Sequence, residues 1–232
     1  MRARDLQPEL MDDPTLPAEE HRRALAGLAR LNACSNSVGV LWPAVRKLAY
    51  ELGRPVKILD VATGGGDVPL GLWARAKRAG IELELSACDI SPVALETAAA
   101  RTRAAGATVN YFPTDALDEA LPTGFDIVTC SLILHHLSDD NAAVLLARLA
   151  AATDCLVLVN DLSRSRWNLG LVWTATRLFT RSPVVRVDGP LSVRAAFTRV
   201  EATALARHAG LTGVTVETRF PCRWLLTWRK PA

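Results

Sequence analysis

The sequence predicts an α/β protein with a seven-stranded, mostly parallel sheet, an antiparallel last strand, helices on both faces and a helical cap. Three observations predict it. From Val56 onward, strand-like and helix-like segments alternate, which is typical of a parallel sheet covered on both faces. A glycine-rich turn, Gly64–Gly66, joins the first strand to its helix. The last two strands are separated only by a short link around Pro221, so they should pair antiparallel at the sheet edge.

The individual elements follow this alternation. Strands are expected at 56–61, 82–88, 108–112, 125–130, 154–160, 213–219 and 223–229. Helices are expected at 67–79, 92–105, 139–152 and 199–209. Two of the helix starts carry clear signals: Ser91 precedes Pro92 at a first helical position, and Thr198 with Glu201 forms a capping box.

Two segments lie outside the alternation. Residues 18–52 predict two helices that are broken around Asn32 to Ser37. Residues 163–197 predict an apolar helix followed by an irregular turn at Asp188-Gly189-Pro190. Neither segment carries enough strand signal for a domain of its own, so we expect a single domain over 1–232.

Composition and charge disfavour several classes of protein. The chain has 232 residues, half of them apolar, and its net charge of +3 is too small to indicate nucleic acid as a partner. The N-terminus is polar and acidic, unlike a secretory signal, and no apolar run reaches the roughly 18 residues that span a bilayer. The five cysteines lie far apart, without metal-ligand spacing. We therefore expect a cytoplasmic protein without disulfides, bound metal or integral membrane association.

Acidic residues and glycines gather where the expected strands end. Asp60 ends the first strand, and the three glycines that follow allow a tight bend and a close approach of ligand to main chain. Asp89 ends the second strand, where an acid can accept hydrogen bonds from both ribose hydroxyls. Asp115 follows the third strand, where a side chain can reach an adenine amino group. An acid placed before the glycines favours a ligand with positive charge and no phosphate.

Two nucleotide-binding interpretations compete for the glycine turn. A dinucleotide fingerprint that starts at Gly64 requires glycine or alanine at position 69, where the sequence has Pro69. A P-loop requires a lysine, which the turn lacks. The acids also have structural interpretations, because Asp60 and Asp89 can cap the following helices and Asp115 can belong to an ordinary turn.

Four motifs in this order resemble those of the class I S-adenosylmethionine (SAM)-dependent methyltransferases, over roughly 56–160. The family's acid and GxGxG motif corresponds to Asp60 with Ala62, Gly64 and Gly66, so Ala62 replaces the first glycine. The other motifs are Asp89, Asp115 and the strand Phe125–Ser131. The resemblance implies a Rossmann-like fold with SAM as cofactor and S-adenosylhomocysteine as product. It also divides the chain into an N-terminal helical cap (18–55), a SAM-binding core (56–160), a substrate lid (161–197) and a closing helix with a β-hairpin (198–232).

The resemblance also implies roles for particular residues. The expected cofactor contacts are Arg30, Asp60, Ala62, Thr63, Gly64, Gly66, Asp89, Ile90, Asp115, Ala116 and Ser131, with Arg30 meeting the methionine carboxylate. His135 and His136 follow the fourth strand, and either imidazole can deprotonate an acceptor. The alternative is that this pair only packs against the cofactor or the next helix. The expected acceptor contacts are His135, Asp161, Arg164, Trp167 and Trp173.

The acceptor is expected to be an aromatic or apolar small molecule. The Asn/Asp-Pro-Pro-Tyr motif of base-amino methylases is absent, since Ser131-Leu132-Ile133-Leu134 stands in its place. The chain is similar to methyltransferases of quinone biosynthesis and polyketide pathways, which favours O-methylation of a phenolic or polyketide-derived acceptor. C-methylation of a quinol-like ring is the second hypothesis. An inactive SAM-binding scaffold and a dinucleotide oxidoreductase stay open as other classes, and both a monomer and a homodimer are compatible with the sequence.

Overall fold

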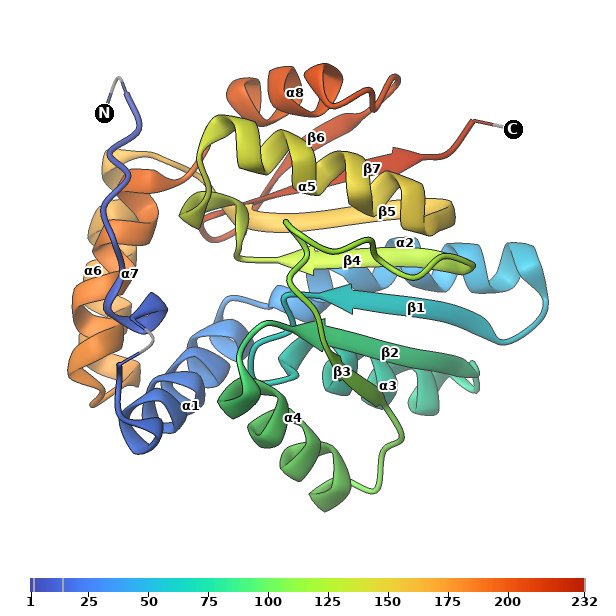
Figure 1. Cartoon of the computed structure of the whole chain (residues 1–232), viewed down its shortest axis with the longest axis horizontal. Helices are drawn as coiled ribbons and strands as arrows, with labels where there is room; N and C mark the ends of the chain where they lie inside the picture. The colour runs from blue at the N-terminus through green and yellow to red at the C-terminus, as the bar shows by residue number, and fades with distance from the viewer. Residues whose placement is uncertain (2, 14, 232) are drawn as a thin grey trace.

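A seven-stranded sheet forms the centre of the protein. The computed structural model describes residues 1, 3–13 and 15–231. The strands lie in the order β3-β2-β1-β4-β5-β7-β6, and only β7 runs antiparallel to its two neighbours (Figure 1). Their bounds are β1 Val56–Val61, β2 Leu83–Asp89, β3 Asn110–Pro113, β4 Phe125–Ser131, β5 Thr153–Leu162, β6 Thr215–Arg219 and β7 Arg223–Arg229. The predicted fold class is therefore confirmed, including the closing antiparallel hairpin.

Helices cover both faces of the sheet because the central strands are apolar on both faces. In β1, Leu59 and Val61 belong to one buried cluster together with residues of α5 (Asp139–Ala152) and α8 (Arg199–His208). The alternate residues of the same strand, such as Ile58, pack in a second cluster with α2 (Ser37–Leu52) and α3 (Asp67–Ala79). This is the two-residue period expected of a strand that is buried on both sides. A further helix, α4 (Pro92–Ala104), packs beside β2 and β3.

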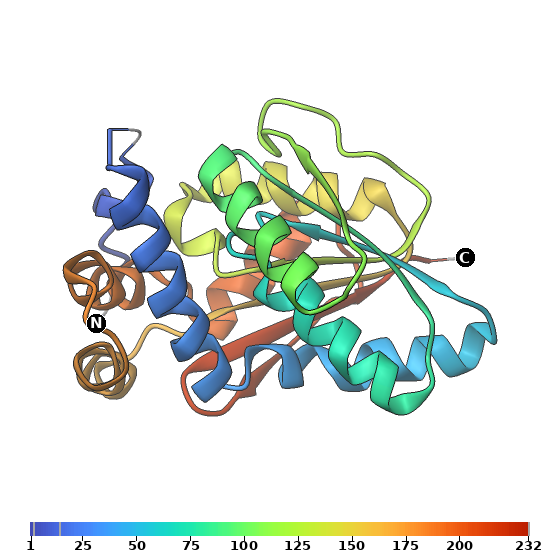
Figure 2. The ribbon, with the colours of Figure 1, turned by 90° about the horizontal axis from the view of Figure 1, so that it is seen from below.

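A helical cap lies beyond the carboxyl ends of the parallel strands. It consists of α1 (Ala18–Cys34), α6 (Arg166–Phe179), α7 (Pro183–Ala195) and the short helix η1 (Leu10–Asp12), which contact one another (Figures 1 and 2). Facing the cap, the chain after β4 forms a second short helix, η2 (Leu134–His136). The predicted break between α1 and α2 is confirmed. The ligand-binding edge of the sheet is thus enclosed between the strand ends and these helices.

The irregular turn predicted at Asp188-Gly189-Pro190 is wrong, because these residues lie inside α7. Asp188 and Gly189 each make contacts with residues outside α7. The Asp188 carboxylate accepts the backbone N–H groups of Leu10 and Met11, at 2.9 and 3.1 Å. Gly189 lies where α7 crosses α6, since a Cβ at this position would lie 2.6 Å from Cγ2 of Thr176. Residues that resemble a turn in the sequence therefore mark close packing in the fold.

Within the part of the chain that the structure describes, no helix is both long enough and apolar enough to cross a bilayer.

Candidate functional site

A cavity of about 800 Å³ opens at the carboxyl ends of β1, β2 and β4, where the sheet order reverses direction. Ligands of open α/β sheets bind at this position. Nine of the predicted cofactor residues line it: Asp60, Ala62, Thr63, Gly64, Asp89, Ile90, Asp115, Ala116 and Ser131. The opposite wall comes from the cap and includes Met11, Leu16, His21, Leu25, Leu28 and Asn32.

The glycine turn has the tight backbone that its sequence predicts. Gly64 and Gly66 have positive φ angles of 52° and 74°, and Ala62 has a φ of 55°. Ala62 keeps the left-handed conformation of the glycine it replaces, at a strain of roughly 1–2 kcal/mol. Gly66 does not line the cavity. It precedes α3, where a Cβ would lie 2.8 Å from the Tyr111 hydroxyl, so it allows the loop to pack against its neighbours.

Asp60 is buried at the floor of the cavity. Its carboxylate accepts the hydroxyl hydrogens of Thr63 and Thr129, at 2.7 and 2.6 Å. Burial raises the pKa of Asp60 to about 7, although the two hydroxyls oppose that rise. A cationic ligand group near this carboxyl would favour its ionised form. The floor of the cavity therefore suits positive charge.

Asp89 joins the second strand to the glycine turn. One carboxylate oxygen accepts the Gly64 N–H at 2.7 Å and the other accepts the Ser91 N–H at 2.9 Å. Burial raises the pKa of Asp89. Each oxygen still has a second acceptor site for a ligand hydroxyl. Asp115 similarly accepts the N–H of Leu117 at 2.8 Å, so it organises a turn as well as the cavity wall.

Ser131 carries an unpaired polar atom in the cavity wall. Its Oγ is buried and has no hydrogen-bond partner among the described residues. A buried hydroxyl without a partner is uncommon in folded proteins and indicates a group that a ligand can satisfy. With Asp60, Asp89 and the glycine turn, it lines the cavity with hydrogen-bond donors and acceptors.

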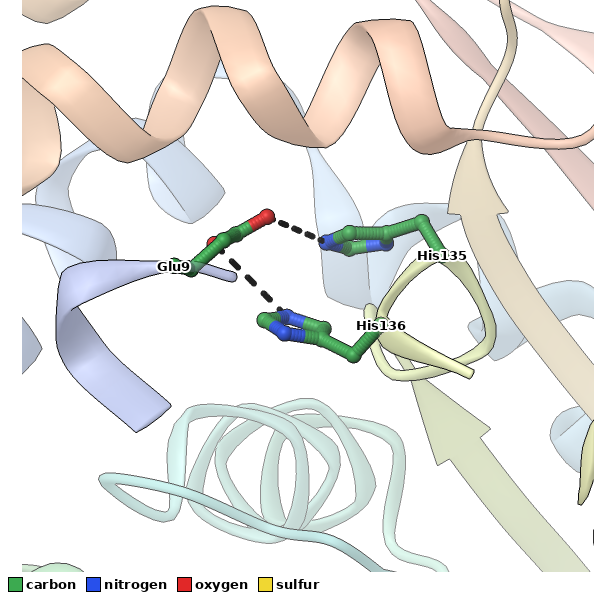
Figure 3. A group of neighbouring side chains, drawn as sticks. All are labelled: Glu9, His135 and His136. Carbon is green, nitrogen blue, oxygen red and sulfur yellow. Dashed lines mark ion pairs between the residues drawn. The ribbon is translucent and has the colours of Figure 1, made fainter. Parts of the chain in front are cut away.

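The two adjacent histidines have different surroundings. His135 is buried outside the cavity wall, and its Nδ1 lies 2.6 Å from the Asp161 carboxylate. His136 lines the cavity, and its Nδ1 lies 2.8 Å from the Asp12 carboxylate. Burial lowers the pKa of His136, but the hydrogen bond that its ring donates to Asp12 and the charge of Glu9 outweigh burial and raise that pKa to about 9. Figure 3 shows that both rings face Glu9.

Several predicted site residues lie away from the cavity. The Arg30 guanidinium donates to the Phe179 carbonyl at 2.9 Å, at the end of α6, instead of reaching the cofactor pocket. Trp167 and Trp173 are 74% and 50% exposed on the outer side of α6, and the Arg177 guanidinium stacks on Trp173 at 3.7 Å.

The two polar residues predicted after the fifth strand serve other groups. Arg164 is buried, and it donates to the Ala196 carbonyl at 2.7 Å and to Glu201 at 2.5 Å. The Asp161 carboxylate lies 2.6 Å from Nδ1 of His135. Burial alone would raise the pKa of Asp161, but the contact with the His135 ring outweighs burial and lowers that pKa. Because these side chains are committed to cap and core contacts, neither one lines the cavity in the described structure.

The sequence reasoning missed the N-terminal contributions to this site. Met11, Asp12 and Asp13 line the cavity, and Glu9 lies 3.8–4.0 Å from the two histidines. The acidic and polar character of this segment is visible in the sequence, but nothing local in it indicates contact with the distant His135-His136 pair.

The comparisons with known proteins agree with this geometry. Residues 58–154 match a family model described as a methyltransferase domain. The demethylmenaquinone methyltransferase of Thermus thermophilus is 34% identical over 133 residues, which are 55% of this chain and 59% of that protein. The ubiquinone biosynthesis O-methyltransferase of Thiobacillus denitrificans is 37% identical over 90 residues, covering 38% of this chain and 36% of that protein. The chain thus matches about a third to three fifths of the length of these relatives.

Solved structures share the fold. The SAM-dependent methyltransferase SibL superposes with a TM-score of 0.64 at 21% identity, over 87% of this chain and 56% of that chain. The magnesium protoporphyrin IX methyltransferase of Synechocystis superposes with a TM-score of 0.54 at 14% identity, over 92% of this chain and 84% of that one. Residues 58–154 thus match the model of a methyltransferase domain, and the chain has the fold of these methyltransferase structures.

Proposed function

We propose that this chain binds SAM and transfers its methyl group to a small molecule, with a phenolic or polyketide-derived oxygen as the preferred acceptor. One observation carries the proposal. A single cavity combines the acids and glycine turn of the methyltransferase motif with an apolar wall contributed by the cap. The matched methyltransferase domain and the names of the relatives support it.

The cofactor end of the cavity suits the separate parts of SAM. Asp89 would accept the ribose hydroxyls, and Asp115 with Ala116 would border the adenine. The buried Asp60 would face the cationic methionine portion, because a positive group compensates the cost of its ionisation. The free hydroxyl of Ser131 would gain its missing partner.

We place the acceptor on the side of the cavity toward the cap (the acceptor end), where several apolar side chains lie beside His136. Leu16 and Leu28 line it from the N-terminal side, and Ile133 and Leu137 line it from the segment after β4. Bound SAM supplies a methyl group on a sulfonium, which is already activated for in-line displacement. The residues of the cavity therefore need to align the acceptor and exclude water, and such alignment can contribute on the order of 7–11 kcal/mol.

His136 is the histidine that borders the acceptor end, and His135 lies behind it against Asp161. We propose that the neutral form of His136, which predominates above its pKa of about 9, accepts the proton of the acceptor hydroxyl, and that His135 positions this turn. A phenol with a pKa of about 10 benefits from such a neighbour, since its anion is the better nucleophile. Asp161 acts through His135 and does not itself contact the acceptor.

Methylation at carbon is the second candidate. The name demethylmenaquinone methyltransferase concerns a quinone precursor, whereas the ubiquinone relative is named as an O-methyltransferase. These names support a phenolic or quinol-like ring as the substrate class. We prefer oxygen as the atom that is methylated, because the sequence resembles methyltransferases of quinone biosynthesis and polyketide pathways.

The proposal is tested by calorimetry followed by turnover. The full chain should bind SAM and not NAD, and it should transfer a labelled methyl group to at least one member of a panel of phenols, resorcinols and quinols. Mass spectrometry of the product distinguishes O-methylation from C-methylation. SAM binding without turnover on the panel would favour the inactive scaffold, and binding of NAD alone would favour the oxidoreductase.

A further inference from the structure

Three metal-ligand atoms converge outside the SAM motifs. Nε2 of His135 lies 4.0 Å from one carboxylate oxygen of Glu9, and Nε2 of His136 lies 3.8 Å from the other (Figure 3). The three groups offer ligand atoms within 4.8 Å of one another. Glu9 and His135 are both buried, although a carboxylate is rarely buried without compensation. The residues come from the N-terminal segment and from η2, which the fold brings together.

The opposite nitrogen of each imidazole is already held by a carboxylate. Nδ1 of His135 lies 2.6 Å from Asp161, and Nδ1 of His136 lies 2.8 Å from Asp12. A metal-bound histidine typically donates its second ring N–H in this way, which fixes the ring and raises the basicity of the ligating nitrogen. Both Nε2 atoms are therefore oriented by their other ring nitrogen.

Glu9 and the two imidazole rings also face one another across the centre of this cluster (Figure 3). When each Nδ1–H is donated to its carboxylate, a neutral imidazole presents only a lone pair at Nε2. Both Nε2 atoms face the Glu9 carboxylate, at 4.0 and 3.8 Å. One Glu9 oxygen is held by the Ser192 hydroxyl, which donates at 2.7 Å and fixes the carboxylate toward the rings. An ion at the centre of this cluster would lie within reach of all three ligand groups.

We propose that Glu9, His135 and His136 bind a divalent transition metal ion of the zinc type. Two imidazoles and one carboxylate are a common ligand set for such an ion and leave a fourth position for water or another ligand. Magnesium and calcium prefer oxygen ligands and do not suit this set. Tetrahedral bonds of about 2.0–2.1 Å place neighbouring ligand atoms roughly 3.3 Å apart. The two separations between Nε2 and the carboxylate, 4.0 and 3.8 Å, would therefore have to shorten by about 0.5–0.7 Å when an ion binds.

The site goes beyond the proposed methyl transfer, but it adjoins the same cavity. His136 lines that cavity, as does Met11 beside the ligand segment. A metal ion here would tie the N-terminal segment to η2 and so hold one wall of the acceptor end in place. It would also occupy Nε2 of His136, and the acceptor would then meet the ion and its fourth ligand instead of a free imidazole.

The test is metal binding by the full chain after treatment with a chelator. Calorimetry with Zn²⁺ should give saturable one-to-one binding, and Co²⁺ should give visible absorption bands typical of a four-coordinate site. Glu9→Gln and His136→Gln should each weaken Zn²⁺ binding by at least about tenfold, as should Asp161→Asn, which acts through His135. Matched controls are Glu20→Gln and His208→Ala, both at exposed positions, which should retain wild-type affinity.

Thermal unfolding in the absence of SAM verifies that each variant is folded. Wild-type protein that shows no saturable Zn²⁺ or Co²⁺ binding would overturn the proposal. Equal Zn²⁺ affinity in the wild type and Glu9→Gln would also overturn it. SAM calorimetry on the same samples separates this result from a failure of the proposed methyl transfer.

Discussion

The buried carboxyl of Asp60 should make the free energy of unfolding depend on pH. Its side chain lies on the floor of the cavity, and burial raises its pKa from 3.8 to about 7. The native state therefore holds this proton more tightly than the unfolded chain does. Protonated Asp60 stabilises the native state fully below pH 3.8, the pKa of this carboxyl in the unfolded chain. This stabilisation is lost as the pH rises toward and through 7, the pKa in the native state.

The magnitude follows from the separation of the two pKa values. A difference of about 3 between folded and unfolded states corresponds to about 4 kcal/mol of unfolding free energy, as an upper bound. Asp60→Asn removes this titration and retains an amide that can bond to the hydroxyls of Thr63 and Thr129. We expect the variant to equal or exceed wild-type stability at pH 8 and to lose that advantage at pH 4.

The assay is urea unfolding of both proteins between pH 4 and pH 8. Asp89 and Asp188 also have pKa values raised by burial, so the wild-type slope alone is not diagnostic. The difference between wild type and Asp60→Asn isolates the one carboxyl, because the other two acids remain in both proteins. Parallel stability curves across this range would refute the argument that Asp60 is held in its protonated form.

The same carboxyl should couple SAM binding to pH. If the cationic part of SAM faces Asp60, ionisation of the carboxyl favours binding, and SAM affinity in the wild type should rise as pH increases through 7. Calorimetry in buffers of different ionisation enthalpy should detect a proton released on binding. Asp60→Asn should bind SAM more weakly at pH 8 and show no such release.

Three further predictions concern single side chains at the cavity. Asp89→Ala should weaken SAM binding by at least tenfold, about 1.4 kcal/mol, in calorimetry, since the ribose loses its acceptor; unchanged affinity would remove Asp89 from the site. Gly66→Ala should cost more unfolding free energy than the control Gly80→Ala, because both have a positive φ but only Gly66 has the Tyr111 hydroxyl 2.8 Å from the added Cβ. His136→Ala should lower kcat at saturating SAM with SAM affinity unchanged, and an unaltered kcat would limit that side chain to packing.

The sheet and the cofactor end were predictable because their signals are local. Asp60 and Asp89 each lie at the carboxyl end of a strand whose apolar pattern is evident in the sequence. Parallel strands then bring these ends together without further information.

The cap was harder to predict because its side chains depend on helix rotation and on distant partners. The sequence places Trp173 on an apolar helix, but only packing decides which side of α6 faces the cavity. Arg30 was predicted near the cofactor, and its position beside the end of α6 depends on a contact 149 residues away. Asp12 meets His136 across 124 residues, which no local pattern records.

The cap residues that line the cavity differ from those that the sequence predicted to contact the acceptor. The sequence predicts a substrate lid at 161–197, yet among the described residues the cavity wall includes side chains from 11–13, from 16–32 and from the segment after β4. In this arrangement α6 and α7 support α1 from behind, and Leu28 packs against Val184 and Val185 while also lining the cavity.

Leu28→Ala should therefore reduce kcat/KM for an aromatic acceptor with little change in SAM affinity. A lost aliphatic contact in a substrate pocket is typically worth about 1–3 kcal/mol, or roughly 10–200-fold. Trp173→Ala removes a larger side chain from the outer side of α6, and it should leave kcat/KM within about twofold because that ring is not in the cavity wall. Steady-state kinetics on the same acceptor compares the two. If Trp173→Ala impairs the reaction and Leu28→Ala does not, acceptor specificity lies with the segment 161–197 after all, and the cap must close differently when substrate is bound.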